Sequence, residues 1–348
     1  MKDKTLIKRI PVIIIKVLLI ILLVYLLNRL FTPKYETENL DGRITREYYK
    51  EKLDTDIIFV GSSTVYSGIS PMVLWQEKGY TSYDRSNASQ TIWTSYYMIE
   101  DAIKYRKPEL VVLDVGFIKY DDDFCEEPSN RKAIDGMRLS RSKIDLIKAA
   151  SGKDEKLSEY LFPVLRFHTR WKELTSEDFL YTFYDRDVTY NGFLFDFRET
   201  ETLPAHDGYA HGDEVVISPK NLEYLNKTIE LCRDNDVELF LMKVPSYSDN
   251  WSLGYDRRIG EIASNSGIDY VNFDPYSDEM GIDYRKHSPD EGSHLNTTGA
   301  EIFTSYLGDY IKDHYDITSH SNDPKYEKVW EKKLVRYEND KKTVKGRQ

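Results

Sequence analysis

The chain has 348 residues, of which 48 are Lys or Arg and 59 are Asp or Glu, so its formal net charge is −11. Apolar residues make up 40% and charged residues 31%, a composition typical of a folded protein and not of a disordered one. The length suits one sizeable α/β domain with additions. The two cysteines, Cys125 and Cys232, exclude a fold held by several disulfides, and the sequence leaves open whether they pair.

The charge is unevenly distributed along the chain. Residues 1–34 hold seven bases and one acid, and residues 321–348 hold nine bases and five acids. Residues 35–320 therefore hold 32 bases and 53 acids. Such an acidic region repels phosphate, so nucleic-acid binding is excluded.

An apolar segment, IPVIIIKVLLIILLVYLL, occupies residues 10–27. At about 1.5 Å per residue it is long enough to cross a hydrocarbon core of roughly 30 Å. A cleaved signal peptide is the alternative, but residues 28–31 offer no small-residue cleavage site. We therefore predict that residues 1–31 form a basic cytoplasmic N-terminus and an uncleaved signal anchor of a single-pass cell-membrane protein. The segment is preceded by four basic residues, Lys2, Lys4, Lys8 and Arg9. By the positive-inside rule this flank stays in the cytoplasm, so the domain after the segment is expected outside the cell.

The remaining chain predicts a polar stalk at 32–52 and an α/β domain at 53–320. Short apolar runs without alternation predict strands at 56–63, 110–117, 237–245 and 269–273. Helical spacing of apolar residues predicts helices at 70–78, 91–107, 218–234, 257–265 and 298–314. Buried strands divided by amphipathic helices indicate a doubly wound parallel sheet, which binds ligands at the carboxyl ends of its strands.

Two segments depart from this alternation. Residues 120–216 hold helical patterns and many aromatic side chains, and they predict a helical insertion over one edge of the sheet. A lid over the site and an ordinary structural addition are both compatible with that insertion. Residues 321–348 are charged and show no clear apolar face, so they predict a solvated helix or a disordered tail.

Two polar loops carry candidate chemistry. Gly61-Ser62-Ser63 follows the first strand, where a hydroxyl lies near the backbone N–H groups that begin a helix. His294 precedes the last helix, and an acid a few residues before it can orient the imidazole. In a doubly wound sheet both loops can face one crevice. The usual nucleotide-binding loops are absent from the sequence, and we expect no cofactor.

The segments FVGSSTVYSG and EGSHLNTTGA resemble the first and last blocks of the SGNH/GDSL hydrolase superfamily. That resemblance covers residues 53 to 316 in order and spacing, and it implies a flavodoxin-like α/β fold. It also implies that Ser63 is the nucleophile and His294 the base. Glu291 occupies the acid position, with the neighbouring Asp290 as an alternative.

The sequence departs from the family pattern at the oxyanion site. Ser62 stands where the family usually has Asp, and Ile118 lies near the position of the usual oxyanion Asn. Asn87, next to Ser86, is a candidate substitute donor. These departures resemble the membrane-anchored branch, which includes teichoic-acid D-alanylation and alginate O-acetylation proteins and works beside membrane-bound O-acyltransferases.

We therefore predict an extracytoplasmic serine esterase or O-acyltransferase that acts on acyl esters, of the acetyl type, in a cell-envelope polysaccharide or related polymer. Its expected partners are that substrate, the membrane and a membrane-bound O-acyltransferase. The alternative is a catalytically weak relative that binds glycan or acts as a scaffold. A metal site is not expected. The candidate ligands are His206, Asp207 and His211, and the sequence around them is typical of a surface loop.

Overall fold

The computed structural model describes residues 4–33, 42–184, 187–205, 215–248 and 251–346. Its central sheet has five strands in the order β2-β1-β3-β4-β5, and every neighbouring pair is parallel. From β1 the chain runs to β2 on one side and then to β3 on the other, so the strand order reverses at β1. The predicted doubly wound parallel sheet is confirmed. Its strands are β1 (Ile57–Gly61), β2 (Ser82–Ser86), β3 (Leu110–Asp114), β4 (Glu238–Lys243) and β5 (Asp269–Asn272).

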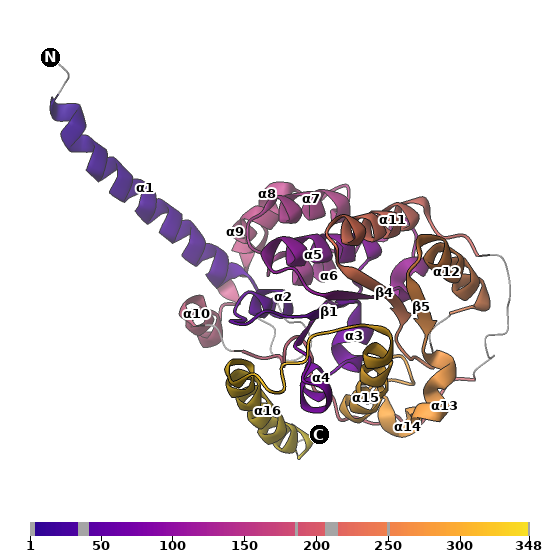
Figure 1. Cartoon of the computed structure of the whole chain (residues 1–348). Helices are drawn as coiled ribbons and strands as arrows, with labels where there is room; N and C mark the ends of the chain where they lie inside the picture. The colour runs from indigo at the N-terminus through magenta and orange to yellow at the C-terminus, as the bar shows by residue number, and fades with distance from the viewer. Residues whose placement is uncertain (1–3, 34–41, 185–186, 206–214, 249–250, 347–348) are drawn as a thin grey trace. The chain divides into compact units, whose positions relative to one another are not determined.

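Helices cover both faces of the sheet (Figure 1). On one face α5 (Ile92–Tyr105) packs against β1 and α11 (Pro219–Asp234) packs against β4. On the other lie α3 (Ser63–Gly68), α4 (Pro71–Lys78) and α15 (Thr297–His314), which share a core with alternate strand residues such as Phe59 and Phe240. The other elements of this layered domain are α6 (Glu127–Ile134), α7 (Arg141–Ala150), α12 (Leu253–Ser266), α13 (Ser277–Met280), α14 (Tyr284–His287), and the short 3₁₀ turns η1 (Gly116–Lys119) and η3 (Asp274–Tyr276).

The strands and helices predicted at 56–117 and at 218–314 all have counterparts, with ends shifted by a few residues. Apolar runs do not reveal β2, because its sequence is Ser-Tyr-Asp-Arg-Ser and yet all five residues are buried. Arg85 is tolerated there because it forms an ion pair with Asp101 at 3.0 Å and lies over the ring of Tyr48.

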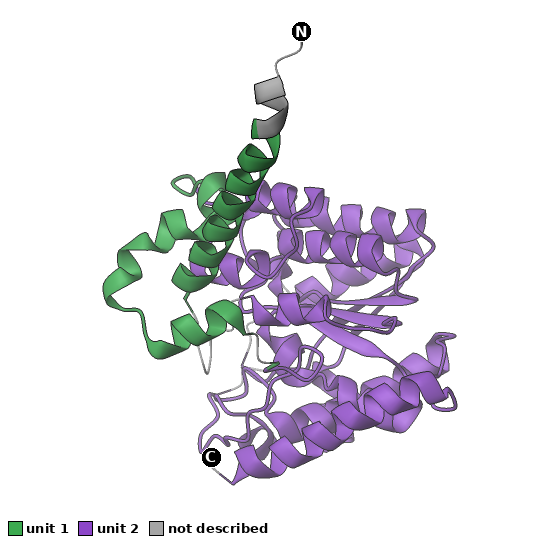
Figure 2. Ribbon diagram, turned by 90° about the vertical axis from the view of Figure 1, so that its left-hand side faces the viewer, with its two compact units in different colours: residues 1–41, 153–187 green, residues 42–152, 188–348 purple. Residues whose placement is uncertain are grey.

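The chain divides into two compact units, residues 1–41 with 153–187 and residues 42–152 with 188–348 (Figure 2). The predicted insertion is largely helical, but its middle part, residues 153–187, belongs with the N-terminal helix, whereas the parts before and after it belong with the sheet. The first unit holds α1 (Lys4–Phe31), α8 (Leu157–Leu161), α9 (Pro163–Phe167), the 3₁₀ helix η2 (His168–Lys172) and α10 (Ser176–Phe183).

Part of the predicted stalk belongs to the folded sheet domain. Helix α2 (Arg43–Tyr48) is mostly buried, and the hydroxyl of Tyr83 in β2 donates to the carbonyl of Ile44 at 2.8 Å. Ile44 and Tyr48 are four residues apart, so they share one face of this helix and anchor it. The prediction of a stalk is therefore wrong for residues 43–48.

The C-terminal segment is a packed helix and not a solvated tail. Helix α16 (Pro324–Lys345) buries Tyr326, Trp330 and Tyr337, which lie on one face because they are spaced by four and seven residues. The ring of Trp330 stacks on that of Trp75 with centroids 5.3 Å apart. These three aromatic residues join the main core. They were hard to recognise in the sequence because they are few and lie among many lysines.

Asp84 is an isolated carboxyl group inside the domain. It lies opposite Phe59 in the register of β1 and β2, and it is fully buried. Within the described residues neither of its oxygens has a hydrogen-bond partner. Burial raises the pKa of Asp84 well above its usual value, so the folded protein favours the neutral acid.

Replacement of this carboxyl by a neutral amide, Asp84→Asn, should therefore stabilise the protein at neutral pH and not in acid. The unfolded chain releases the Asp84 proton above a pH of about 4, whereas the folded chain retains it, so wild-type stability falls as pH rises through that window. Urea unfolding in detergent should show a variant advantage that grows from pH 4 to pH 8. Parallel stability curves for the two proteins would contradict this reading of Asp84.

Candidate active site

The loop after β1 holds Ser63 at the carboxyl edge of the sheet. Because the strand order reverses at β1, this edge is where doubly wound sheets bind ligands. Helix α3 begins at Ser63, so the Ser63 N–H has no acceptor within its own helix. Gly61 permits the tight turn, since a Cβ at that position would lie 2.6 Å from Cγ2 of Val65 and 2.8 Å from Cβ of Asp114.

The turn before α15 holds His294. The hydroxyl of Ser288 accepts hydrogen bonds from the N–H groups of Asp290, at 3.3 Å, and Gly292, at 2.9 Å. Glu291 and Gly292 have positive φ angles of 58° and 91°. A side chain at position 292 would come within 2.5 Å of Cβ of Tyr247. This tight reversal returns the chain so that His294 lies beside Asp290.

Three side chains from these two loops form one hydrogen-bonded chain. The hydroxyl of Ser63 lies 2.7 Å from Nε2 of His294, and Nδ1 of His294 lies 2.5 Å from Oδ2 of Asp290. An ionised carboxylate can only accept, so Nδ1 carries the proton and donates to Asp290. Nε2 is then free to accept from the Ser63 hydroxyl, which is the arrangement that a general base requires.

The geometry distinguishes the two acidic candidates. Asp290 contacts His294 twice, since its Oδ1 also accepts from the His294 backbone N–H at 2.9 Å. Glu291 occupies the left-handed position of the turn, and its side chain is exposed. Asp290 and not Glu291 is therefore in contact with the imidazole. The side chains of His294 and Asp290 are 29% and 43% exposed, so a solute can reach both.

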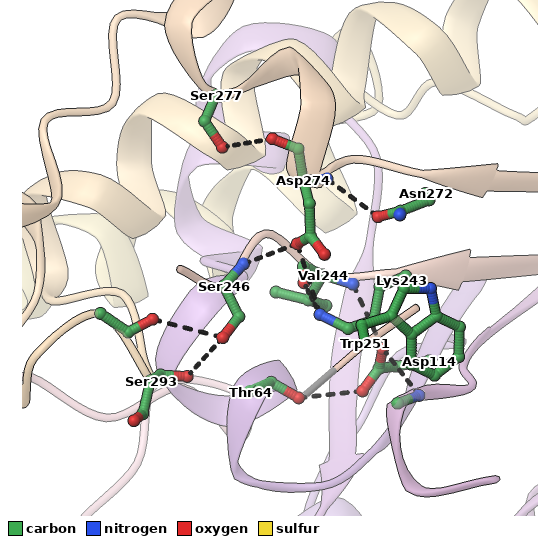
Figure 3. A network of polar contacts seen from close by, with 12 residues as sticks. Thr64, Asp114, Lys243, Val244, Ser246, Trp251, Asn272, Asp274, Ser277 and Ser293 are labelled. Atoms are coloured by element: carbon green, nitrogen blue, oxygen red, sulfur yellow. Dashed lines mark hydrogen bonds and ion pairs between the residues drawn. The ribbon is translucent and has the colours of Figure 1, made fainter. Parts of the chain in front are cut away.

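A buried polar network lies beneath the two loops (Figure 3). The hydroxyl of Thr64 donates to Oδ2 of Asp114 at 2.9 Å, and Oδ1 of Asp114 accepts from the N–H of Val244 at 3.2 Å. Asp114 ends β3 and Val244 follows β4. The serine turn is thereby connected to the ends of two neighbouring strands.

The same network continues to the histidine turn. The ammonium group of Lys243 lies 3.3 Å from Oδ1 of Asp274, which also accepts from the N–H of Ser246 at 2.7 Å. The hydroxyl of Ser246 then donates to the carbonyl of Gly292 at 3.2 Å. Buried groups therefore connect, step by step, the loops that hold Ser63 and His294.

Lys243 partly neutralises the charge of the two buried carboxyl groups in this network. Burial raises the pKa of Asp114, while Lys243 and the hydrogen bonds from Val244 and Thr64 act in the opposite direction. Lys243 is almost fully buried and lies between two carboxylates. Its positive charge is needed there, because two buried carboxylates without a cation would be strongly destabilising.

Within the described residues no hydrogen bond joins Ser62, Asn87 or Ser86 to the Ser63–His294 pair. The Ser62 hydroxyl lies 3.1 Å from that of Thr64, so Ser62 joins the buried network. The Asn87 amide donates to Gln90 at 2.9 Å and, at 3.5 Å, to Thr45, so both of its hydrogens already have acceptors. Ser86 is buried, and its hydroxyl has no hydrogen-bond partner in the described part of the chain.

Five network residues were not identified from the sequence: Thr64, Asp114, Lys243, Ser246 and Asp274. The sequence does contain a sign of two of them, Asp114 and Lys243, because each is a charged residue at the end of a largely apolar strand. The described ranges contain no cluster of three His, Cys, Asp or Glu residues that could hold a metal ion. His206, Asp207 and His211 lie outside those ranges.

No protein-family model matches the chain, and no curated protein matches its sequence. Among solved structures, it is similar to a protein of Bacteroides fragilis provisionally assigned as an acylhydrolase, with 12% identity and a TM-score of 0.36 over 77% of this chain and 94% of that one. A provisionally assigned platelet activating factor of Streptococcus pneumonia has 14% identity and a TM-score of 0.39, over 78% and 92%. A GDSL-like lipase of Bacteroides thetaiotaomicron has 12% identity and a TM-score of 0.35, over 79% and 100%.

Removal of Lys243 alone should destabilise the protein more than removal of Lys243 together with Asp274. Lys243→Met leaves Asp274 and Asp114 without their cation, and about 3–5 kcal/mol should be lost from the free energy of unfolding. Asp274→Asn alone leaves Lys243 beside Asp114 and should cost less, while the double variant should recover part of the Lys243→Met loss. Denaturant unfolding of the four proteins measures the coupling, and strictly additive losses would contradict the network described here.

Proposed function

We propose that this protein is a serine acyl hydrolase or acyltransferase with Ser63, His294 and Asp290 as its catalytic groups. The observation that carries the proposal is the unbroken chain from the Ser63 hydroxyl through the imidazole to the carboxylate, with distances of 2.7 and 2.5 Å. A serine hydroxyl is a weak nucleophile without an adjacent base, and this contact supplies that base.

The reaction proceeds in two balanced steps. The Ser63 oxygen bonds to the carbonyl carbon of an ester while its proton passes to Nε2 of His294. The tetrahedral intermediate then breaks the bond to the leaving alcohol, which takes that proton and departs. Water or a second alcohol next attacks the acyl-serine by the same route in reverse, and Ser63 is restored. Asp290 stabilises the imidazolium that forms in both steps.

The oxyanion of the tetrahedral intermediate needs hydrogen-bond donors that have no other acceptor. The Ser63 N–H at the start of α3 meets this condition. Asn87 meets it only after its amide leaves Gln90 or Thr45, so its contribution requires a local rearrangement. This observation favours the second candidate function, a catalytically weak relative that binds glycan or acts as a scaffold.

The substrate and partner belong to the same proposal. The apolar segment Arg9–Phe31 is long enough to cross a membrane, and its window is not buried by the rest of the chain. The side chain of Arg29 donates to the carbonyls of Tyr181 and Thr182, so the end of this helix is part of a folded unit. A retained anchor explains these contacts better than a cleaved signal. We accordingly propose an extracellular domain that acts on acyl esters of an envelope polysaccharide, with a membrane-bound O-acyltransferase as partner.

A fluorophosphonate probe should label the detergent-solubilised full-length protein at one residue, Ser63. Labelling should disappear in Ser63→Ala and fall by at least about 100-fold in rate in His294→Ala, because the base is lost. Mass spectrometry of the labelled peptide and turnover of a small acetyl ester provide the measurements. An unlabelled, well-folded protein that still binds saccharide would favour the scaffold function.

The two adjacent acids provide a matched pair of variants. Asp290→Asn should reduce esterase turnover by about 10²–10⁴-fold, since the imidazolium loses its carboxylate and the ring its fixed tautomer. Glu291→Gln changes the same charge at the neighbouring position and should retain turnover within a few-fold. The reverse order of effects would transfer the acid role to Glu291, as the family resemblance implies.

A further inference from the structure

Helix α10 exposes three bulky apolar side chains on one side. Phe179, Leu180 and Phe183 lie on one side of this helix and are exposed, and Phe183 is 78% exposed. On the opposite side Asp178, Tyr181 and Thr182 are buried. A capping box between Thr175 and Asp178 fixes where the helix begins. A helix that exposes so much apolar surface is costly in water and indicates contact with an apolar medium.

The helices before α10 also expose bulky apolar side chains. We call residues 157–184 the collar, and within the described chain it holds a large share of the exposed bulky apolar side chains outside α1. Trp171 is 63% exposed. The exposed apolar members of the collar are Leu157, Phe162, Leu165, Trp171, Phe179, Leu180, Phe183 and Tyr184.

The collar is attached to the last turn of α1. The guanidinium of Arg29 donates to the carbonyl oxygens of Tyr181, at 2.8 Å, and Thr182, at 2.7 Å. The side-chain oxygen of Asn28 accepts from the N–H of Val164 at 3.1 Å. Arg170 donates to the carbonyl of Phe31 at 2.7 Å. These bonds come from three separate parts of the collar, so they fix its position along the helix axis.

That position corresponds to the surface of a membrane. If Arg9 lies at the inner headgroups, Asn28 lies about 30 Å further along the helix, at the depth of the outer headgroups. From Ile10 to Leu23 the α1 side chains are exposed, and from Val24 most of them are half-buried against the collar. Aromatic side chains and leucines at this depth are typical of membrane–water interfaces.

We propose that the collar is a membrane-docking surface whose exposed aromatic and leucine side chains insert into the headgroup–acyl boundary of the outer leaflet. The inference rests on the retained anchor of the proposed function and extends it from one helix to a folded unit. Residues 153–184 hold five Lys/Arg and six Asp/Glu. Insertion is therefore driven by apolar burial and does not require anionic lipid.

A lipid occupant is favoured over a protein occupant by the distribution of these side chains. They come from several short helices attached around one point of α1, whereas recognition of a partner helix uses one continuous apolar face. Contact with a bilayer requires only that the exposed side chains lie at a similar depth in the membrane. The hydrogen bonds to Asn28, Arg29 and Phe31 hold the collar at one level of α1.

Site-directed spin labelling tests the depth of the collar in the full-length protein. Cys125 and Cys232 are not joined in a disulfide; Cys125 is replaced by Ser, and Cys232 is buried with its pKa raised by that burial to about 12, so it reacts poorly. Single labels are placed by Phe183→Cys and Trp171→Cys in the collar, Leu19→Cys in α1, and Leu139→Cys at an apolar site outside the collar that is 76% exposed. The protein is reconstituted in vesicles of phosphatidylcholine, and separately of phosphatidylethanolamine with phosphatidylglycerol.

Collision rates of each nitroxide with oxygen and with a water-soluble nickel chelate report its depth. We expect an oxygen-to-nickel ratio several-fold higher at positions 183 and 171 than at 139, and equal in both lipid mixtures. If the label at 19 is buried in the bilayer but the collar labels are as accessible to nickel as the label at 139, membrane docking by the collar is overturned. The membrane anchor then still stands. Collar labels shielded only in native membranes would overturn membrane docking by the collar in favour of a protein partner. A nickel-accessible label at 19 would overturn anchor and collar together, without affecting probe labelling of Ser63.

Discussion

The 2.7 Å contact between Ser63 and His294 joins two residues that are 231 positions apart in the chain. No local preference can form it, so it depends on the whole sheet being assembled in the correct order. Placement of β1 beside both β2 and β3 puts the serine turn at the point where the strand order reverses. The histidine turn, which directly precedes α15, lies at the same edge. The proposed activity therefore depends first on the strand order of the sheet, and only then on the sequence of either loop.

The buried network makes that long-range contact specific. An acid from β3, a lysine from β4 and an acid after β5 are brought together under the two loops. Buried ion pairs contribute little net stability, because desolvation offsets their attraction. Their value here is geometric, since a misplaced strand would leave Asp114, Lys243 or Asp274 without its partners. We interpret the network as a device that penalises incorrect arrangements of the site.

The sequence predicts the sheet, its helices and the two loops well, because all of these follow from apolar periodicity and from residues at strand ends. It does not decide between Asp290 and Glu291, since the answer depends on a left-handed turn at Glu291 that composition does not reveal. It assigns Asn87 a donor role without seeing that Gln90 and Thr45 already accept from that amide. The buried faces of α2 and α16 were concealed for a related reason, since their few apolar anchors are diluted by charged residues.

The exposure of the site bears on the choice between hydrolysis and transfer. His294 and Asp290 are 29% and 43% exposed, so water reaches the base in the structure as it stands. An acyl-serine formed here is hydrolysed unless an acceptor alcohol excludes that water, because water exclusion is what protects reactive intermediates. Transfer therefore requires that the acceptor polymer, or a protein that presents it, cover the histidine turn. In the proposed mechanism the same three residues serve either reaction, and the covering molecule decides which one occurs.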